Sequence, residues 1–301
     1  MKAIMFEQFG GPEVLSVREV SLPRPAPGQV RIRVRAAGLN QLDFKIRSGV
    51  MQQVFPTTFP AVPGVEAAGV IDELGPDVTG LAVADEVIAF TDTGSYAEYA
   101  LATVVARKPA GLGWDEAVAL PVAGETAQRV LDLLAVKEGE TLLVHGAAGA
   151  VGGIAVQLAV AAGVTVIGTS SPANHDHLRS LGVTPVAYGA GLVDRVRALA
   201  PQGVDAVFDA AGYGVLPDSI ELRGGTAERV VTIADPAARE LGVVFSGGGR
   251  NRADLLAEHA RLAAAGTLRV TVAATFPLPE AGRAQDQSAT GHNRGKIVLR
   301  P

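Results

Sequence analysis

Residues 141–163 read TLLVHGAAGAVGGIAVQLAVAAG: an apolar strand-like run, a turn of glycines and alanines, and an uncharged helix-like run. A chain omits side chains this densely only where its backbone turns sharply or must approach something closely. In the dinucleotide-binding fingerprint, the first small residue makes the turn, the second admits the pyrophosphate, and the third lets helix and strand pack. These positions fall on Ala147, Gly149 and Gly152, which predicts a dinucleotide-binding turn.

Segments with strand and helix character alternate after this turn. VTVIGTS, TPVAYG, VDAVFDAAG, RVVTIAD and GVVFSGG have strand character, and helical segments such as NHDHLRSLG and VDRVRALA separate them. Strands that alternate with helices at this spacing indicate a parallel sheet, so we expect a doubly wound Rossmann domain of about six strands. The uncharged stretch 146–174 resembles a membrane span in hydropathy, but Gly163, Gly168 and Pro172 divide it. We therefore expect a buried βαβ unit there and no membrane segment.

The N-terminal part has the pattern of an antiparallel sheet. In QVRIRVRAAG, Val30, Ile32 and Val34 alternate with arginines, as in a half-buried strand. Strand character returns after Gly266 in TLRVTVAATFPL and GKIVLRP. The fold class expected is therefore α/β. Residues 122–266 would form the Rossmann domain, and residues 1–121 and 267–301 a mostly antiparallel β domain.

Composition excludes several classes of function. The chain has 301 residues, a net charge of −5 and no cysteine. Without a basic block, nucleic acid is not an expected partner. Without cysteine, disulfides, thiolate metal sites and cysteine nucleophiles are ruled out. The N-terminal stretch MKAIMFEQFGGPEVL lacks the apolar segment of a signal peptide, so we expect a cytoplasmic protein.

The end of the second Rossmann strand predicts which dinucleotide binds. An acidic residue there accepts from the ribose 2′-hydroxyl of NAD and repels the 2′-phosphate of NADP. This chain reads GTSSPANH, in which Ser170 and Ser171 can donate to a phosphate and no carboxylate precedes Asp176. The charge argument favours NADPH over NADH. The turn holds no arginine or lysine, so a cationic partner must come from elsewhere.

The chain resembles the medium-chain dehydrogenase/reductase superfamily, in its zinc-independent quinone oxidoreductase branch, which includes the zeta-crystallins. The stretches that carry this resemblance follow the family order over nearly the whole chain and read AAGLNQLDFKIRSG, FPAVPGVEAAGVI, GSYAEYA, ALPVAGETA, HGAAGAVG, NHDHLRSLG and GHNRGKIVL. The resemblance implies a GroES-like fold for the antiparallel β domain, a nicotinamide cofactor, a reductase activity and a homodimer.

The resemblance also implies a set of cofactor and substrate residues. The residues expected to contact the cofactor are Asn40, Thr126, Ala148, Gly149, Ala150, Val151, Gly168, Ser170, Ser171, Tyr188, Ile233, Ala234, Phe245, Ser246, Gly247 and Arg294. Arg294, which forms a C-terminal basic pair with Lys296, is a candidate for the missing cation. Val50, Met51 and Phe55 are expected to line the substrate cleft, and Met51 stands where some members have a tyrosine.

No metal is expected. In zinc alcohol dehydrogenases of this superfamily, a cysteine ligand falls where Asn40 stands and a histidine ligand where Val65 stands. Hydride transfer must then go to an acceptor that is already electrophilic, such as a quinone, with the Asn40 amide as a candidate hydrogen-bond donor to its oxygen. Two alternatives stay open at this point. One is reduction of the carbon–carbon double bond of an enone, and the other is a non-catalytic NADPH-binding redox sensor.

Other polar residues have structural interpretations. We expect Asp43 and Lys45 to form a structural or surface pair, and Glu66 to anchor its loop by hydrogen bonds. His145 is expected to pack at the end of its strand. Residues two apart on a helix point to different faces, so His175 and His177 are not expected to chelate a metal.

Overall fold

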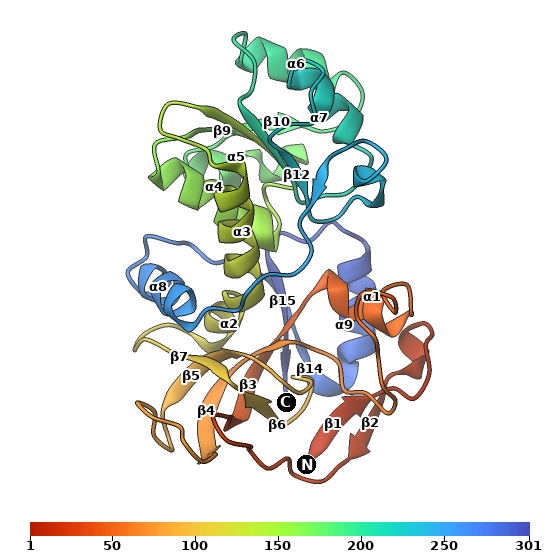
Figure 1. Ribbon diagram of the computed structural model, residues 1–301, viewed down its shortest axis with the longest axis vertical. Helices are drawn as coiled ribbons and strands as arrows, with labels where there is room; N and C mark the ends of the chain where they lie inside the picture. Colours follow the sequence, from red (N-terminus) through yellow and green to blue (C-terminus); the bar gives the residue numbers. More distant parts are fainter. The chain divides into compact units, whose positions relative to one another are not determined.

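The computed structural model describes residues 1–301, which divide into two compact units. Unit 1 comprises Met1–Val122 and Asn251–Pro301, and unit 2 comprises Ala123–Arg250 (elements labelled in Figure 1). The second boundary differs from the expected one at residue 266. Helix α8 (Ala253–Ala264) packs against strand β7 (Val104–Arg107) and so belongs to unit 1. The helix therefore does not cover the Rossmann sheet, and its buried side chains, Leu256, His259 and Ala260, belong to unit 1.

Unit 2 contains one six-stranded parallel sheet, as predicted. Its strand order is β10-β9-β8-β11-β12-β13, and every neighbouring pair is parallel. This is a doubly wound order: β9 and β10 are added on one side of β8, and β11, β12 and β13 on the other, so the order of addition reverses between β8 and β11. The strands are β8 (Thr141–His145), β9 (Thr165–Ser170), β10 (Thr184–Ala187), β11 (Ala206–Asp209), β12 (Val230–Thr232) and β13 (Val244–Phe245).

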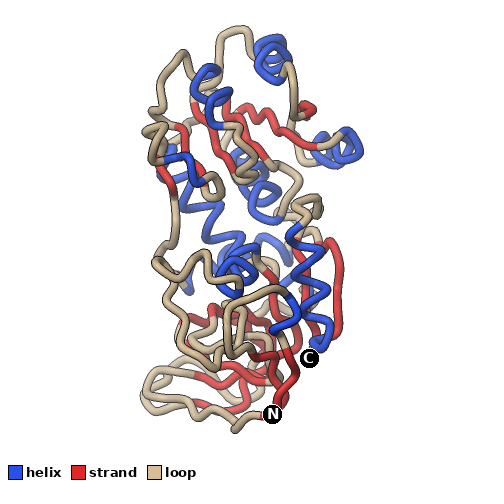
Figure 2. Tube along the Cα trace, turned by 90° about the vertical axis from the view of Figure 1, so that its right-hand side faces the viewer, coloured by secondary structure: helices blue, strands red, loops and turns tan.

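Helices flank this sheet and complete its core (Figure 2). Buried side chains of the strands, such as Leu143, Ile167 and Val207, pack with Val196 and Leu216 of the helices. Burying both faces of a parallel sheet gives the near-continuous apolar strands seen in the sequence. The helical elements are α3 (Pro121–Leu134, which begins in unit 1), α4 (Ala150–Ala161), η2 (Pro172–Asn174), α5 (His175–Ser180), α6 (Leu192–Leu199), α7 (Leu216–Leu222) and η3 (Pro236–Ala238).

Unit 1 is built on a seven-stranded sheet. Its path is β14-β15-β3-β4-β5-β7, and β6 also pairs with β3. All pairs are antiparallel except β14 with β15. The predicted return of the C-terminal segment to this unit is confirmed, because β15 pairs directly with β3. The strands are β3 (Val30–Leu39), β4 (Glu66–Leu74), β5 (Glu86–Phe90), β6 (Tyr99–Ala102), β7, β14 (Val272–Pro277) and β15 (Lys296–Arg300); β1 (Lys2–Met5) and β2 (Ser16–Glu19) form a separate hairpin.

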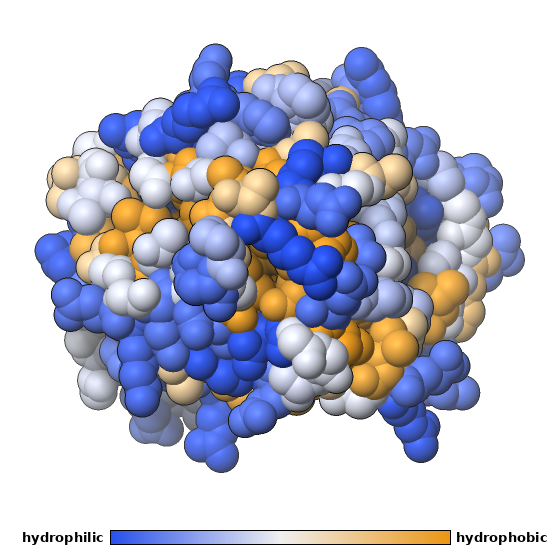
Figure 3. Space-filling view, turned by 90° about the horizontal axis from the view of Figure 1, so that it is seen from above, coloured by the Kyte–Doolittle hydropathy of each residue, from blue (hydrophilic) through white to orange (hydrophobic).

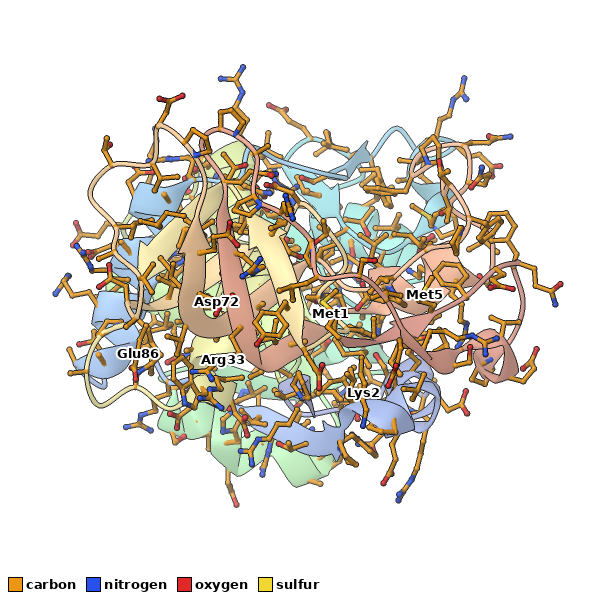
Figure 4. All side chains as sticks on the ribbon, turned by 90° about the horizontal axis from the view of Figure 1, so that it is seen from below. Met1, Lys2, Met5, Arg33, Asp72 and Glu86 are labelled. Atoms are coloured by element: carbon orange, nitrogen blue, oxygen red, sulfur yellow. The ribbon has the colours of Figure 1, made fainter.

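Strand β3 has the alternation that its sequence predicts. Val30, Ile32 and Val34 are buried, whereas Arg33 is exposed and Arg31 pairs with Asp72 on β4. Figure 4 views this sheet from below and labels Arg33, Asp72 and Glu86, which come from three neighbouring strands. From Ala36 to Leu39 every residue is buried, so the strand ends inside the unit.

Short helices cover the sheet of unit 1. A core of apolar side chains, among them Ile4, Leu39, Phe276 and Leu299, lies beneath helix α9 (Ala281–Ala289). Helix α9 has no apolar stripe in the sequence, because it buries Gln285 and Ser288 beside two alanines. The remaining helical elements are η1 (Pro12–Val14), α1 (Gln41–Arg47), α2 (Trp114–Val118), η4 (Leu278–Glu280) and α9 (Ala281–Ala289).

Apolar patches interrupt the hydrophilic surface on the face seen in Figure 3. Single exposed apolar side chains are normal in folded proteins. Those of unit 2 include Tyr188 and Tyr213, which follow β10 and β11, and Val244 and Phe245, which form β13. None of the helices is both long enough and apolar enough to cross a lipid bilayer.

Candidate functional site

The glycine turn of unit 2 joins the end of β8 to the start of α4. Gly146 has a φ of +72°, so the left-handed residue of the turn is Gly146 and not Ala147. Ala147 lies within the turn, as expected, but the residue that adopts its left-handed conformation is Gly146. A Cβ disfavours the left-handed conformation, which explains why Gly146 and not Ala147 adopts it. Ala147 is fully buried, and its N–H donates to the carbonyl of Thr169 at 3.2 Å.

Two glycines allow close packing around this turn. A Cβ placed on Gly152 would lie 2.2 Å from the carbonyl oxygen of Gly146, and one on Gly168 would lie 2.7 Å from the Cβ of Ala147. Real Cβ atoms do not approach other atoms so closely. Helix α4 and strand β9 therefore pack directly on the turn, which is the role expected for the third position of the fingerprint.

Gly149 has no comparable internal reason to be glycine. Its φ of −75° suits any residue, and the nearest atom to an added Cβ is 3.3 Å away. It caps α4 without a side-chain hydrogen bond, so no side chain occupies the first-turn N–H groups. Ala148, Ala150 and Val151 add only small apolar side chains around these amides. The turn has the amide donors that a pyrophosphate needs and few side-chain atoms beside them.

The end of β9 carries the hydroxyls predicted to meet the adenosine ribose. Ser170 Oγ donates to the carbonyl of Ser171 at 3.1 Å, and Asn174 Nδ2 donates to Ser171 Oγ at 3.2 Å. The hydroxyl hydrogen of Ser171 is therefore left for another acceptor. Tyr188, which follows β10, is half exposed. The sequence did not identify Arg195, whose guanidinium donates to the carbonyls of Ala187, Gly189 and Ala190 and so holds the Tyr188 loop.

Asp209 organises the ends of the next strands. Its Oδ1 accepts from the N–H groups of Ala211 and Gly212, both at 2.9 Å, and its Oδ2 accepts from Thr232 Oγ1 at 2.7 Å. Thr232 Oγ1 in turn accepts from the N–H of Ala234 at 3.1 Å. The turns after β11 and β12 are thus fixed to each other, and the second one carries the expected nicotinamide residues Ile233 and Ala234.

Arg129 on α3 links two other predicted cofactor residues. Its guanidinium donates to Ser246 Oγ and, at 3.4 Å, to Thr126 Oγ1, while its Nε donates to Glu125 at 2.8 Å. A Cβ on Gly249 would lie 1.9 Å from Glu125 Oε1, so the segment after β13 packs tightly on α3. The segment that contains Phe245, Ser246 and Gly247 is therefore held by a residue that the sequence did not identify.

In unit 1, Asn40 belongs to a buried cluster of charged and polar residues. It lies between β3 and α1, Glu66 begins β4, and Lys296 begins β15. Lys296 Nζ donates to Asn40 Oδ1 at 2.6 Å and forms an ion pair with Glu66. Asn40 Nδ2 donates to Glu66 Oε1 at 2.7 Å, and the N–H of Val122 donates to Glu66 Oε2 at 2.8 Å. Glu66 therefore anchors its surroundings by hydrogen bonds, as predicted.

Asp43 supports this cluster from within α1. Its Oδ2 accepts from the backbone N–H of Asn40 and from the Tyr96 hydroxyl, both at 2.8 Å. The predicted pairing of Asp43 with Lys45 is wrong, because Asp43 is buried on the inner face of the helix. Burial raises the pKa of Asp43 to about 6, against the lowering effect of these two hydrogen bonds and of Lys296. Burial and the neighbouring Asp43 also raise the pKa of Tyr96.

The remaining predicted residues of unit 1 lie at its surface. Val50 is 73% exposed, and Met51 and Phe55 are partly exposed in the turn that follows α1. Arg294 is exposed, whereas Lys296 is buried. The two do not form an equivalent basic pair, because only Lys296 has a buried carboxylate partner.

His145 packs at the end of β8, as predicted. Its Nε2 lies 3.1 Å from Ser219 Oγ, which donates its own hydrogen to the carbonyl of Val215 at 2.7 Å. The hydroxyl must therefore accept from the imidazole, which places the proton of the ring on Nε2. Burial lowers the pKa of His145 to about 4, although Asp209 opposes this shift. The side chain is a neutral component of the unit 2 core.

Two parts of the chain match known families. A profile described as "Alcohol dehydrogenase GroES-like domain" matches residues 26–124, and one described as "Zinc-binding dehydrogenase" matches residues 181–299. A quinone oxidoreductase structure from Coxiella burnetii superposes with a TM-score of 0.89 at 32% identity, over 100% of this chain and 99% of that one. The chain belongs to the quinone oxidoreductase branch of the medium-chain dehydrogenase/reductase superfamily.

Other members match over different lengths. A mycobacterial protein solved with NADPH has a TM-score of 0.86 and 28% identity, over 100% of both chains. The mouse synaptic vesicle membrane protein VAT-1 homolog-like is 34% identical over 213 residues, which are 69% of this chain and 51% of that protein. The present chain thus aligns with about half the length of this curated relative.

The residues around Asn40 do not fit the zinc ion of the alcohol dehydrogenases in this superfamily. Neither Asn40 nor Val65 supplies the thiolate or imidazole that zinc prefers. The ammonium of Lys296 is bonded to both the amide oxygen and the carboxylate that lie there. No three His, Cys, Asp or Glu side chains come together in a way that could hold a metal ion.

Proposed function

We propose that this protein is an NADPH-dependent reductase that transfers a hydride to a quinone without the help of a metal ion. The observation that carries this proposal is the cluster of Asn40, Glu66 and Lys296. A carboxamide bound to an ammonium and a carboxylate can offer a hydrogen bond to a ligand, but it cannot hold a Lewis-acid metal. Membership of the quinone oxidoreductase branch supports the same assignment.

The glycine turn would hold the nicotinamide cofactor. The first-turn amides of α4 would bind its pyrophosphate, and the lack of a side chain at Gly149 would let it approach the backbone. Arg129 and Asp209 would orient the strand ends that carry Ser246 and Ala234, respectively. When bound, the cofactor supplies the hydride.

The preference for NADPH rests on charge at the end of β9. Residues 170–175 contain no carboxylate, and the hydroxyl of Ser171 has a free hydrogen for a phosphate oxygen. A phosphate there would meet no repulsion from its immediate neighbours, whereas the hydroxyl of NADH would find no acidic acceptor.

The acceptor must be activated before it binds. The cluster offers hydrogen-bond donors but no set of metal ligands, and the two carboxyl groups there, those of Glu66 and Asp43, are buried and already bonded to other groups of the chain. A quinone satisfies these conditions, because the negative charge that develops during reduction spreads onto its oxygens. An N–H of Asn40 would stabilise that charge, and solvent would provide the proton.

A panel of acceptors tests the proposal. Oxidation of NADPH is followed with the purified protein and a series of quinones, enones and alkenals, with NADH in a parallel series. We expect turnover with quinones and a higher kcat/KM for NADPH than for NADH. Turnover with enones alone would show that the acceptor is an activated carbon–carbon double bond and not a quinone. Tight NADPH binding with no turnover on any acceptor would instead indicate a redox sensor.

A further inference from the structure

Two charged neighbours set the orientation of the Asn40 carboxamide. Lys296 Nζ donates to its Oδ1 at 2.6 Å, and its Nδ2 donates to Glu66 Oε1 at 2.7 Å. An ammonium has only donors, and an ionised carboxylate has only acceptors. Rotating the amide by half a turn would place its NH2 against the ammonium and its oxygen against the carboxylate. Only one orientation therefore satisfies both neighbours.

This orientation leaves one N–H of Asn40 for a ligand. Nδ2 carries two hydrogens, and Glu66 is its one acceptor in the chain. Glu66 is fully buried and Lys296 is 2% exposed, whereas Asn40 is partly exposed. Because Oδ1 is bonded to a cation, the amide is polarised and its free N–H is a stronger donor.

We infer that Lys296 is a positioning residue, which together with Glu66 presents an Asn40 N–H to the carbonyl oxygen of the acceptor. This inference rests on the proposed function, because that function supplies the carbonyl ligand. Lys296 touches neither acceptor nor cofactor in this assignment. It acts through Asn40 by excluding the orientation in which the amide oxygen would face that carbonyl.

The hydrogen bond from Val122 suggests how to reverse the amide without leaving a buried charge. The N–H of Val122 donates to Glu66 Oε2 at 2.8 Å. In the double variant Lys296→Met/Glu66→Gln, the single amide oxygen at position 66 is needed by Val122. The NH2 group at position 66 then faces Asn40, which must turn its Oδ1 toward that group. In the double variant the Asn40 carboxamide should therefore be reversed, with Oδ1 toward position 66 and Nδ2 toward position 296.

Kinetics of the double variant provide the first test. We expect kcat/KM for a quinone, measured at saturating NADPH, to fall about 10-fold or more, while the Tm stays close to that of the wild type. The single variant Lys296→Arg, in which the guanidinium again has only donors, should keep most of the wild-type activity. The control is Arg283→Met/Glu280→Gln, which removes an exposed ion pair in the same unit. A merely structural role for Lys296 predicts a lower Tm and no selective loss of kcat/KM.

Neutron diffraction provides a second test that needs no turnover, because it distinguishes the nitrogen of an amide from its oxygen. The wild type should show Oδ1 toward Lys296 and deuterium on Nδ2 toward Glu66, and the double variant should show the reverse. The inference is overturned if the wild-type amide is reversed or disordered, or if the folded double variant keeps the wild-type kcat/KM. Absence of turnover in the wild type would overturn the proposed function, whereas the neutron result would still decide the orientation.

Discussion

Lys296 and Glu66 form an ion pair in which both side chains are almost completely buried, and both are bonded to Asn40. A buried ion pair contributes little net stability, because removing two charges from water offsets much of their attraction. Its contribution here is geometric. The pair orients a carboxamide at a place where zinc-dependent relatives use ligands to a metal.

Removing one member of this pair should destabilise the protein more than removing both. Lys296→Met leaves Glu66 buried without a counter-ion, so we expect the free energy of unfolding to fall by about 3–5 kcal/mol. Lys296→Met/Glu66→Gln removes both charges and should recover most of that loss. Urea unfolding measures both changes. Equal losses in the single and double variants would contradict a coupled pair.

A series of glycine variants separates packing from cofactor binding. Gly152→Ala places a Cβ 2.2 Å from a backbone oxygen and should destabilise unit 2. Gly149→Ala meets nothing closer than 3.3 Å, so the fold should survive, but we expect NADPH affinity to fall about 10-fold because the methyl group obstructs the pyrophosphate. Gly153→Ala, whose added Cβ meets its nearest atom at 3.8 Å, is the control. Thermal unfolding and titration with NADPH distinguish the effects; unchanged affinity in Gly149→Ala would refute the binding role.

An acidic residue at the end of β9 should reverse the coenzyme preference. Ser170→Asp introduces the carboxylate that this segment lacks, which repels a 2′-phosphate and accepts from a ribose hydroxyl. We expect the ratio of kcat/KM for NADPH to that for NADH to fall roughly 10-fold or more, equivalent to about 1.4 kcal/mol. Ser170→Thr serves as the uncharged control. A ratio that stays constant in Ser170→Asp would place the phosphate elsewhere.

His145 should make unit 2 less stable in acid. Its pKa is lowered by burial from 6.5 to about 4, so between these values the unfolded chain binds more protons than the folded one. The stabilisation is complete above pH 6.5 and is lost as the pH falls toward 4, by about 3 kcal/mol in total. Hydrogen exchange of β8 peptides across this range measures the loss. In His145→Gln the exchange should depend much less on pH, and an unchanged dependence would show that another group is responsible.

Asp43 should affect unit 1 with the opposite sign. Burial raises its pKa from 3.8 to about 6, so the folded state binds more protons than the unfolded state between these values. The free energy of unfolding of unit 1 should fall by about 3 kcal/mol as the pH rises from 3.8 to 6, and it should change little above pH 6. Asp43→Asn keeps an acceptor for Tyr96 and removes the ionisation. Hydrogen exchange of α1 peptides should then lose this pH dependence; exchange that still rises through this range would contradict the assignment.

The Rossmann sheet could be predicted because each part of its evidence is local. Apolar strands, the glycine turn and the spacing of the helices are all contained in short stretches such as 141–163. Helices that bury polar residues could not be predicted, because local patterns in the sequence reveal only apolar faces. Helix α9 places Gln285 and Ser288 in the core, and a pattern search identifies only apolar faces.

The candidate site of unit 1 was only partly predictable. The resemblance singled out Asn40, but its partners Glu66 and Lys296 lie 26 and 256 positions away. Contacts over such separations are created by the pairing of β3 with β4 and β15, which no local pattern specifies. In the same way, Arg129 reaches Ser246 over 117 positions, so its function is evident only in the fold.

The most direct test of metal-free hydride transfer is the rate of NADPH oxidation with a quinone, measured before and after exhaustive dialysis against a zinc chelator. We predict the same rate in both samples, because Lys296, Glu66 and Asn40 satisfy one another without an ion. Loss of the rate on chelation and its recovery on addition of zinc would contradict the account, as would the absence of oxidation with every quinone.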